Sequence, residues 1–229
     1  MKKRVFYTEF AYLMGVIILA IGTAFMTRAD FGVSMVVAPA YLLHLKVSQY
    51  LPFFTFGMAE YVFQAILLIF MMILLRKVKL SYLFSFVTTI VYGIVLDLAI
   101  ALLTHIPSET LGSRSILYLV GMPLCSLGVA FLFHTYIPPA AYELFVKEVS
   151  GKFNYEIHKF KIVYDYTSCA VSIIMSFALF GMWHFEGINV GTVVCALLNG
   201  ILISVFNKIF EKIWIFEDFQ KKHRVLREK

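Results

Sequence analysis

Residues 54–75 read FTFGMAEYVFQAILLIFMMILL, an apolar segment with one charged side chain, Glu60. A hydrocarbon core of about 30 Å requires roughly 20 apolar residues in an α-helix. The segment is long enough to cross a bilayer, so it predicts a transmembrane helix. Glu60 needs an explanation, because a charged side chain inside a membrane helix costs about 2.5–3.5 kcal/mol on insertion scales.

Five further segments share this apolar character. Hydrophobic residues make up 61% of the 229-residue chain and charged residues 15%, whereas a soluble domain carries about 25% charged residues. The first segment is longer than the roughly 7–15 residues of a signal-peptide core, which favours a retained helix. The sequence therefore predicts an all-α membrane protein with six transmembrane helices, at Phe6–Thr27, Phe54–Leu75, Leu80–Leu103, Ser115–Thr135, Lys161–Trp183 and Asn189–Glu211.

The basic residues predict the orientation of these helices. Seventeen of the 20 fall on one side of the six-helix pattern, and three (Arg28, Lys46 and Arg114) fall on the other. Because cytoplasmic loops are enriched in Lys and Arg, we expect both termini in the cytoplasm. The net charge of +6 follows this pattern, so the expected partner is the lipid bilayer and not nucleic acid. The basic tail, residues 216–229, is expected to form a short helix or frayed end against anionic lipid.

Two connections between the predicted helices have an unusual composition. Residues 31–48 and 136–150 are too apolar for solvent loops, yet proline breaks both. Irregular backbone at membrane depth survives only when it is buried in protein or lines a wet cavity. The two segments are therefore either re-entrant at the centre of the protein or amphipathic helices lying at the membrane interface.

The chain contains a weak internal repeat. Four pairs of positions match at offsets of 101–107 residues, and the matched pairs are Arg28 with His134, Tyr41 with Tyr142, Glu60 with Asp165, and Tyr92 with Asn199. A constant offset indicates two three-helix units, residues 1–111 and 112–229. Because three is odd, the second unit enters the membrane from the opposite face. This predicts a 3+3 inverted repeat, an arrangement that recurs in secondary transporters.

The order of several segments resembles a known family. The chain has TRADFGVSMVVAPAYLLHL (27–45), MILLRKVK (72–79), YGIVLDL (92–98), AYELFVKEVSGKF (141–153) and VYDYTSCAVSIIMSFALFG (163–181). These segments resemble the YczE/YyaS-type family of small bacterial membrane proteins, which is distantly related to YitT-type proteins. The resemblance implies a bacterial inner-membrane protein, some of whose relatives are grouped with exporters. Related sequences often show Gly-x-Ser-Pro-Trp where this chain has GVSMV (32–36).

Charged groups inside the predicted helices are the main functional signal. At about 1.5 Å per residue, Glu60 and Asp97 lie at similar depths, and Arg28 lies at the outer end of the first helix. The three are expected to form an outer cluster. His134 and Asp165 would lie near the inner face. Burial favours the neutral form of a carboxyl group, so Glu60 is a candidate proton carrier. The alternative is structural: Arg28 and Asp97 form a packing salt bridge, and Asp165 reaches the cytoplasmic interface.

We therefore predict a small-molecule transporter, proton-coupled or an exporter, with its site between the two repeats. The sequence shows no hydrolase, nucleotide-binding or metal-binding motif, so no enzyme activity, cofactor or metal is expected. One alternative is a substrate-binding subunit of a larger importer, with Ala20-x-x-x-Ala24 as its docking face. Another is a non-transporting accessory protein, and a homodimer is compatible with each. The predicted substrate-binding residues are Arg28, Tyr41, Glu60, Tyr61, Asp97, His134, Tyr142 and Asp165.

Overall fold

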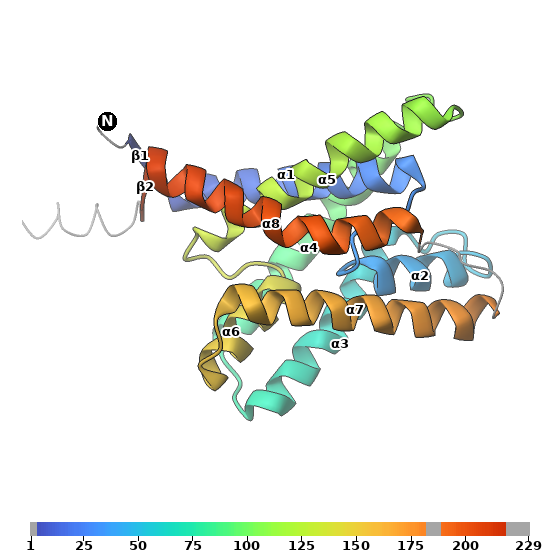
Figure 1. Ribbon diagram of the computed structural model, residues 1–229. Coiled ribbons are helices and arrows are strands. Elements are labelled where there is room, and N and C mark those ends of the chain that lie inside the picture. Colours follow the sequence, from blue (N-terminus) through green and yellow to red (C-terminus); the bar gives the residue numbers. More distant parts are fainter. Residues whose placement is uncertain (1–3, 182–188, 219–229) are drawn as a thin grey trace, which may run out of the picture.

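A computed structural model describes residues 4–181 and 189–218. In these ranges the protein is almost entirely helical (Figure 1). Its elements in chain order are β1 (Arg4–Tyr7), α1 (Thr8–Ala29), α2 (Ala38–Val47), α3 (Phe56–Leu75), α4 (Leu80–Leu103), α5 (Leu111–Phe133), α6 (Ala141–Phe153), α7 (Ile157–Phe180), α8 (Val190–Ile213) and β2 (Trp214–Glu217).

Six of these helices are long and apolar enough to cross a membrane, namely α1, α3, α4, α5, α7 and α8. The predicted all-α membrane fold with six spans is confirmed. Helix ends differ by a few residues from the expected ones. For example, α5 begins at Leu111 and not at Ser115, because the Thr110 hydroxyl accepts the Ser113 N–H at 3.2 Å and caps the helix four residues earlier. Trp183, the expected end of the fifth span, lies outside the described residues.

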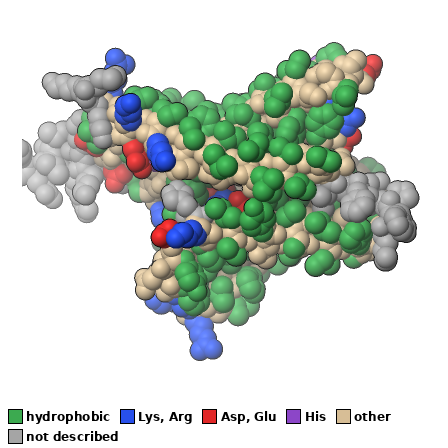
Figure 2. Space-filling model, in the orientation of Figure 1, with side chains coloured by type: hydrophobic (Ala, Val, Ile, Leu, Met, Phe, Trp, Pro, Cys, Tyr) green, Lys and Arg blue, Asp and Glu red, His purple; other side chains and the backbone are tan. Residues whose placement is uncertain are grey.

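The outer surface of the long helices is apolar. Large hydrophobic side chains such as Ile73, Leu102 and Ile174 are exposed along their length. Figure 2 shows these side chains covering the middle of one face, while charged side chains gather toward the ends. Because such a surface is unfavourable in water, its solvent is lipid, and the protein is an integral membrane protein.

The helices pack in a pattern that repeats along the chain. α1 packs against α4 and α5, and α5 packs against α1 and α8. Each short helix, α2 or α6, packs against both α3 and α7. The two short helices lie toward opposite ends of the long ones (Figure 1). If α1, α2, α3 and α4 are exchanged with α5, α6, α7 and α8 in that order, each of these pairings becomes another pairing of the same set.

The crossing of α1 and α5 shows the same reciprocity at the level of residues. A Cβ atom on Gly22 would lie 2.6 Å from the Cys125 backbone nitrogen, and one on Gly128 would lie 2.6 Å from the Leu19 nitrogen. The offset of 106 residues that relates Gly22 to Gly128 also relates Leu19 to Cys125. Small residues permit such close approach between membrane helices.

This crossing makes a direct prediction. Gly128→Ala inserts a methyl group against the α1 backbone, so it should destabilise the protein by about 1–3 kcal/mol. Gly112→Ala is the matched control, because a Cβ there would meet nothing within 4 Å. Thermal melting of both purified variants in detergent tests the difference. Equal melting temperatures would contradict the close crossing.

The small residues Ala20 and Ala24 do not form an outer face. They are 0% and 1% exposed and belong to the main hydrophobic core. The suggested docking surface for an importer is therefore wrong, because the positions are already covered within the bundle.

The chain ends contain a feature that the sequence did not predict. β1 pairs with β2 in parallel, with Phe6 opposite Phe216. Phe6 is therefore strand and not the start of the first helix, and Phe216 and Glu217 are strand and not a helical or frayed tail. Residues 219–229 of the predicted tail lie outside the described residues. Since β1 precedes α1 and β2 follows α8, the first span begins on the side where the last one ends.

Candidate functional site

Both proline-containing segments run into the interior of the protein. Residues 32–40 and 139–146 are buried among the long helices, so both segments lie inside the bundle, as expected for re-entrant segments, and not on its surface. Pro138 and Pro139 break the helical hydrogen-bonding pattern. The Pro138 carbonyl accepts a hydrogen bond from the Thr88 hydroxyl at 2.9 Å, and the Pro139 carbonyl accepts one from the Ser85 hydroxyl at 2.6 Å. These bonds satisfy backbone groups that no water reaches in a membrane interior.

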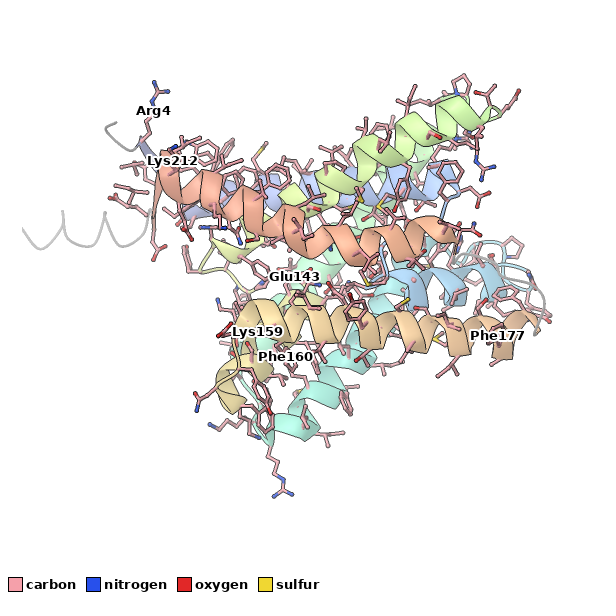
Figure 3. The ribbon with its side chains drawn as sticks, in the orientation of Figure 1. Arg4, Glu143, Lys159, Phe160, Phe177 and Lys212 are labelled. Atoms are coloured by element: carbon pink, nitrogen blue, oxygen red, sulfur yellow. The ribbon has the colours of Figure 1, made fainter. Side chains whose placement is uncertain are left out.

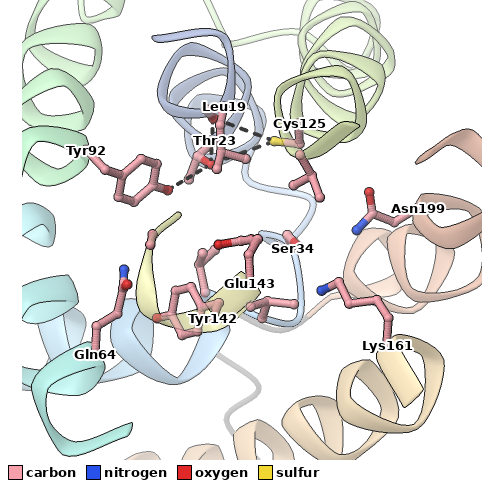
Figure 4. Close-up of a pocket in the computed structure, with 14 residues that line it drawn as sticks. Leu19, Thr23, Ser34, Gln64, Tyr92, Cys125, Tyr142, Glu143, Lys161 and Asn199 are labelled. Carbon is pink, nitrogen blue, oxygen red and sulfur yellow. Dashed lines mark hydrogen bonds between the residues drawn. The ribbon is translucent and has the colours of Figure 1, made fainter. Parts of the chain in front are cut away.

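A cavity of about 30 Å³, lined by both apolar and polar side chains, lies where the two re-entrant segments meet the long helices. Both halves of the chain contribute to its wall, which Figure 4 shows in close-up. Glu143, on the first turn of α6, lies near the centre of the bundle in Figure 3. The lining residues are Leu19, Thr23, Ser34, Val36, Val37, Gln64, Tyr92, Cys125, Val129, Ala140, Tyr142, Glu143, Lys161 and Asn199.

Glu60 lies beside this cavity and is completely buried. The Ala141 backbone N–H can only donate, so the Gln64 atom at 2.9 Å is its carbonyl Oε1. The Gln64 amide Nε2 must then donate to Glu60 Oε2, at 2.8 Å. The Tyr142 hydroxyl donates to the same oxygen at 2.9 Å. Glu60 Oε2 therefore accepts two hydrogen bonds, one of them from α6 and one from a glutamine that α6 orients.

The other oxygen, Glu60 Oε1, makes no hydrogen bond with any described residue. A buried carboxylate oxygen without a partner is unfavourable. Because both neighbours of Oε2 already supply hydrogens, an added proton would reside on Oε1. The geometry gives Glu60 one fixed oxygen and one oxygen free to bind a proton.

Glu143 and Lys161 add further charge to the cavity wall. Lys161 Nζ lies 2.6 Å from Asp165 Oδ1, and both side chains are almost fully buried. Glu143 is also buried, and its Oε2 has no hydrogen-bond partner among the described residues. The cavity is thus bordered by a closed ion pair and by a carboxyl group with an unsatisfied oxygen.

Two positions matched by the internal repeat come together here. Tyr92 on α4 donates to Thr23 Oγ1 on α1 at 3.1 Å. Asn199 on α8 accepts from the Ser126 hydroxyl on α5 at 2.8 Å. Tyr92 and Asn199 both line the cavity, so the matched pair lies on opposite walls of one site.

The expected outer cluster of charges does not form. Arg28 Nη2 donates to the backbone carbonyls of Thr104 at 3.1 Å and Ile106 at 3.0 Å, beyond the end of α4. Asp97 Oδ1 accepts the backbone N–H of Gly57 at 2.9 Å, near the start of α3. The predicted pairing of Arg28 with Asp97 or Glu60 is wrong, because Arg28 satisfies backbone carbonyls and Asp97 satisfies a helix N-terminus.

His134 and Asp165, which were expected near the inner face, each have another partner. His134 Nδ1 is hydrogen-bonded to the Ala130 carbonyl at 2.9 Å, at the end of α5. Asp165 is 3% exposed, so the alternative in which it reaches the cytoplasmic interface is also wrong. Its ion pair with Lys161 replaces both interpretations.

The remaining predicted residues divide between the centre and the periphery. Tyr142 contacts Glu60 and lines the central cavity. Tyr61 donates to the Ile90 carbonyl at 3.3 Å and packs against Gly93 of α4. Tyr41 and Arg28 line a separate cavity of about 340 Å³. Of the eight predicted residues, Glu60 and Tyr142 are adjacent to each other at the centre, Asp165 is joined to the cavity through Lys161, and the other five lie elsewhere.

Several residues of the cavity were missed at the level of sequence. Lys161 and Asp165 stand one helical turn apart, as do Glu60 and Gln64, and this spacing places each pair on one helix face. Glu143 stands four residues after Pro139, in the re-entrant segment. The four-residue spacing of polar side chains was therefore a usable signal for both pairs.

Comparison with known proteins identifies a family. The model of one family, described as "Family of unknown function (DUF6198)", matches residues 6–208. No curated protein and no solved structure matches the chain.

Proposed function

The chain belongs to the DUF6198 family, whose function is unknown, and we propose that this member is a small-molecule transporter with the central cavity as its binding site. The observation that carries the proposal is the cavity itself. Its lining includes the charged side chains of Glu143 and Lys161, it lies inside six apolar helices, and two proline-broken segments with short helices meet there. Secondary transporters bind their substrates at such junctions of discontinuous helices.

The packing supports an inverted repeat as the basis of transport. The reciprocal helix pairings, the reciprocal contacts at Gly22 and Gly128, and the placement of α2 and α6 toward opposite ends each fit a two-fold axis in the membrane plane. In this proposal the two halves rock against each other and expose the cavity alternately. A cavity of about 30 Å³ has room for little more than a water molecule, so substrate entry requires such an opening.

Glu60 supplies the proposed proton coupling. Its hydrogen bonds connect it to α6 through Tyr142 directly and through Ala141 by way of Gln64. Adding a proton at Oε1 removes the negative charge that these donors stabilise. The position of α6 is then linked to the protonation of Glu60. A low pH on one side of the membrane therefore favours the position of α6 that goes with protonated Glu60.

Transport by the purified protein tests the proposal. Untargeted metabolite profiles of cells with and without the protein nominate compounds, and uptake of these compounds into proteoliposomes measures transport. We expect at least one compound to be transported by the wild type and not by Val36→Phe, which fills the cavity wall. If sealed proteoliposomes move none of the nominated compounds, the transporter proposal is overturned.

We also propose that both termini lie in the cytoplasm of a bacterial inner membrane. Arg4, Lys159 and Lys212 lie toward one end of the long helices and Phe177 toward the other (Figure 3), which supports the basic end as cytoplasmic. Reporter fusions after Lys79 and at the C-terminus should report a cytoplasmic position, and a fusion after Pro107 an external one. An external C-terminus would contradict this orientation.

A further inference from the structure

The buried charges around the cavity do not balance. Three carboxyl groups, on Glu60, Glu143 and Asp165, are at most 4% exposed, and Lys161 is 5% exposed. Asp165 is matched by Lys161 at 2.6 Å. Glu60 and Glu143 form no ion pair among the residues that the structure describes. An uncompensated buried charge is strongly unfavourable, so each group requires a proton or a positively charged partner.

The two carboxyl groups differ in their surroundings. Glu60 is held by Gln64 and Tyr142 and lies behind them. Glu143 lines the cavity itself, and its Oε2 has no hydrogen-bond donor among the described residues. The oxygen is therefore available to a molecule that enters the cavity.

The rest of the lining indicates what kind of molecule fits. Val36, Val37 and Val129 provide an apolar wall, and the rings of Tyr92 and Tyr142 lie beside it. Aromatic rings attract cations, and an apolar wall suits an organic substituent better than a bare ion. The lining thus combines a negative group with surfaces that accommodate carbon.

Resting on the proposed transporter function, we propose that the cavity binds the protonated amino group of an organic substrate and that Glu143 is its counter-ion. Glu143 Oε2 accepts an N–H of the ammonium group, and the apolar wall receives the substituent. Glu60 remains the site of the coupling proton. The substrate class is therefore small organic amines in their cationic form.

Positive groups near the cavity do not favour an anion. The Lys161 ammonium is already paired with Asp165. At the start of α2, the N–H groups of Val37 and Ala38 both donate to the Ser34 carbonyl, and Pro39 has no N–H. At the start of α6, Glu143 itself occupies the first turn, where a carboxylate offsets the positive end of the helix dipole. An entering anion would therefore meet a carboxylate and few free donors.

Equilibrium binding of radiolabelled methylammonium to the purified protein in sodium-free detergent buffer tests the proposal. We expect saturable binding to the wild type. Glu143→Gln should weaken it at least tenfold, whereas Glu156→Gln, which alters an exposed carboxylate in an ion pair with Lys159, should not. Gel filtration and thermal melting establish that each variant is folded.

Competition with the wild type makes the test independent of the variants. Unlabelled methylammonium should displace the label, whereas acetate, acetamide and sodium at equal concentration should not. The proposal is overturned by absence of saturable binding, by equal competition from any of those three compounds, or by wild-type affinity in folded Glu143→Gln. Flux measurements distinguish failure of the amine site from failure of the transporter function. Transport of a neutral or anionic compound supports the transporter function and contradicts the amine site. Methylammonium binding without any flux supports the amine site and contradicts the transporter function.

Discussion

Glu60→Gln is expected to abolish proton-driven accumulation of the substrate while leaving the protein folded. Glutamine has the shape of a protonated glutamic acid. Its carbonyl oxygen takes the place of Glu60 Oε2 and accepts the hydrogen bonds of Gln64 and Tyr142, and its amide takes the place of the unpartnered Oε1. The variant is thus fixed in the state that carries a proton, so it cannot release one.

Two flux measurements in proteoliposomes isolate this effect. Exchange of labelled for unlabelled substrate at equal pH on both sides needs no proton cycle, and it should continue in Glu60→Gln. Accumulation driven by a pH gradient needs the cycle, and it should fall to the level of protein-free liposomes. Glu156→Gln, in an exposed ion pair, should accumulate substrate as the wild type does.

Melting temperature and flux together assign the role of Glu60. The variant should melt at or above the wild-type temperature, because a buried carboxylate that forms no ion pair with any described residue has been replaced by a neutral group. Undiminished gradient-driven accumulation by Glu60→Gln would show that the coupling proton is carried elsewhere or that transport is not proton-coupled.

The six spans could be predicted because the length of an apolar segment alone determines whether it can cross a membrane. Phe54–Leu75 and Leu80–Leu103 were expected to end where α3 and α4 end. The terminal strands could not be predicted, since β1 and β2 pair across the whole length of the chain. Such pairing depends on where α1 and α8 place their ends in space.

The charge pairs show the limit of arguments from depth. Arg28, Glu60 and Asp97 were grouped because all three lie in the outer part of the predicted helices, but height does not give the direction in which a side chain points around its helix. Asp97 faces the start of α3 and Arg28 faces the end of α4. Tyr142 was predicted only as one of eight substrate-binding residues, and its contact with Glu60 arises because α6 packs against α3.

Lys161 was misread for a related reason. It was counted among the basic residues at the cytoplasmic boundary, which is the usual place of a lysine at a helix end. In the structure α7 begins one turn earlier, at Ile157, and Lys161 turns inward to Asp165. A lysine and an aspartate four residues apart in an apolar segment are better interpreted as an internal pair.

That pair gives the largest expected effect on stability. Lys161→Met removes the ammonium group and leaves Asp165 buried without its partner, which should destabilise the protein by about 3–5 kcal/mol. Lys159→Met is the matched control, because Lys159 pairs with Glu156 in an exposed position. An exposed pair contributes about 0–1 kcal/mol, so the control should resemble the wild type in a titration with denaturing detergent.

The double variant Lys161→Met/Asp165→Leu tests the physical reason for this loss. Replacing a buried ion pair with apolar residues of similar size is often neutral or stabilising, so the double variant should recover most of the lost stability. If the single variant is as stable as the wild type, Asp165 is neutral or reaches water, and the pair is not closed. If the double variant is as unstable as the single one, the pair also fixes neighbouring polar groups. Glu143, which lines the same cavity as Lys161, is then the residue whose position it would determine, and methylammonium binding by the double variant measures that dependence.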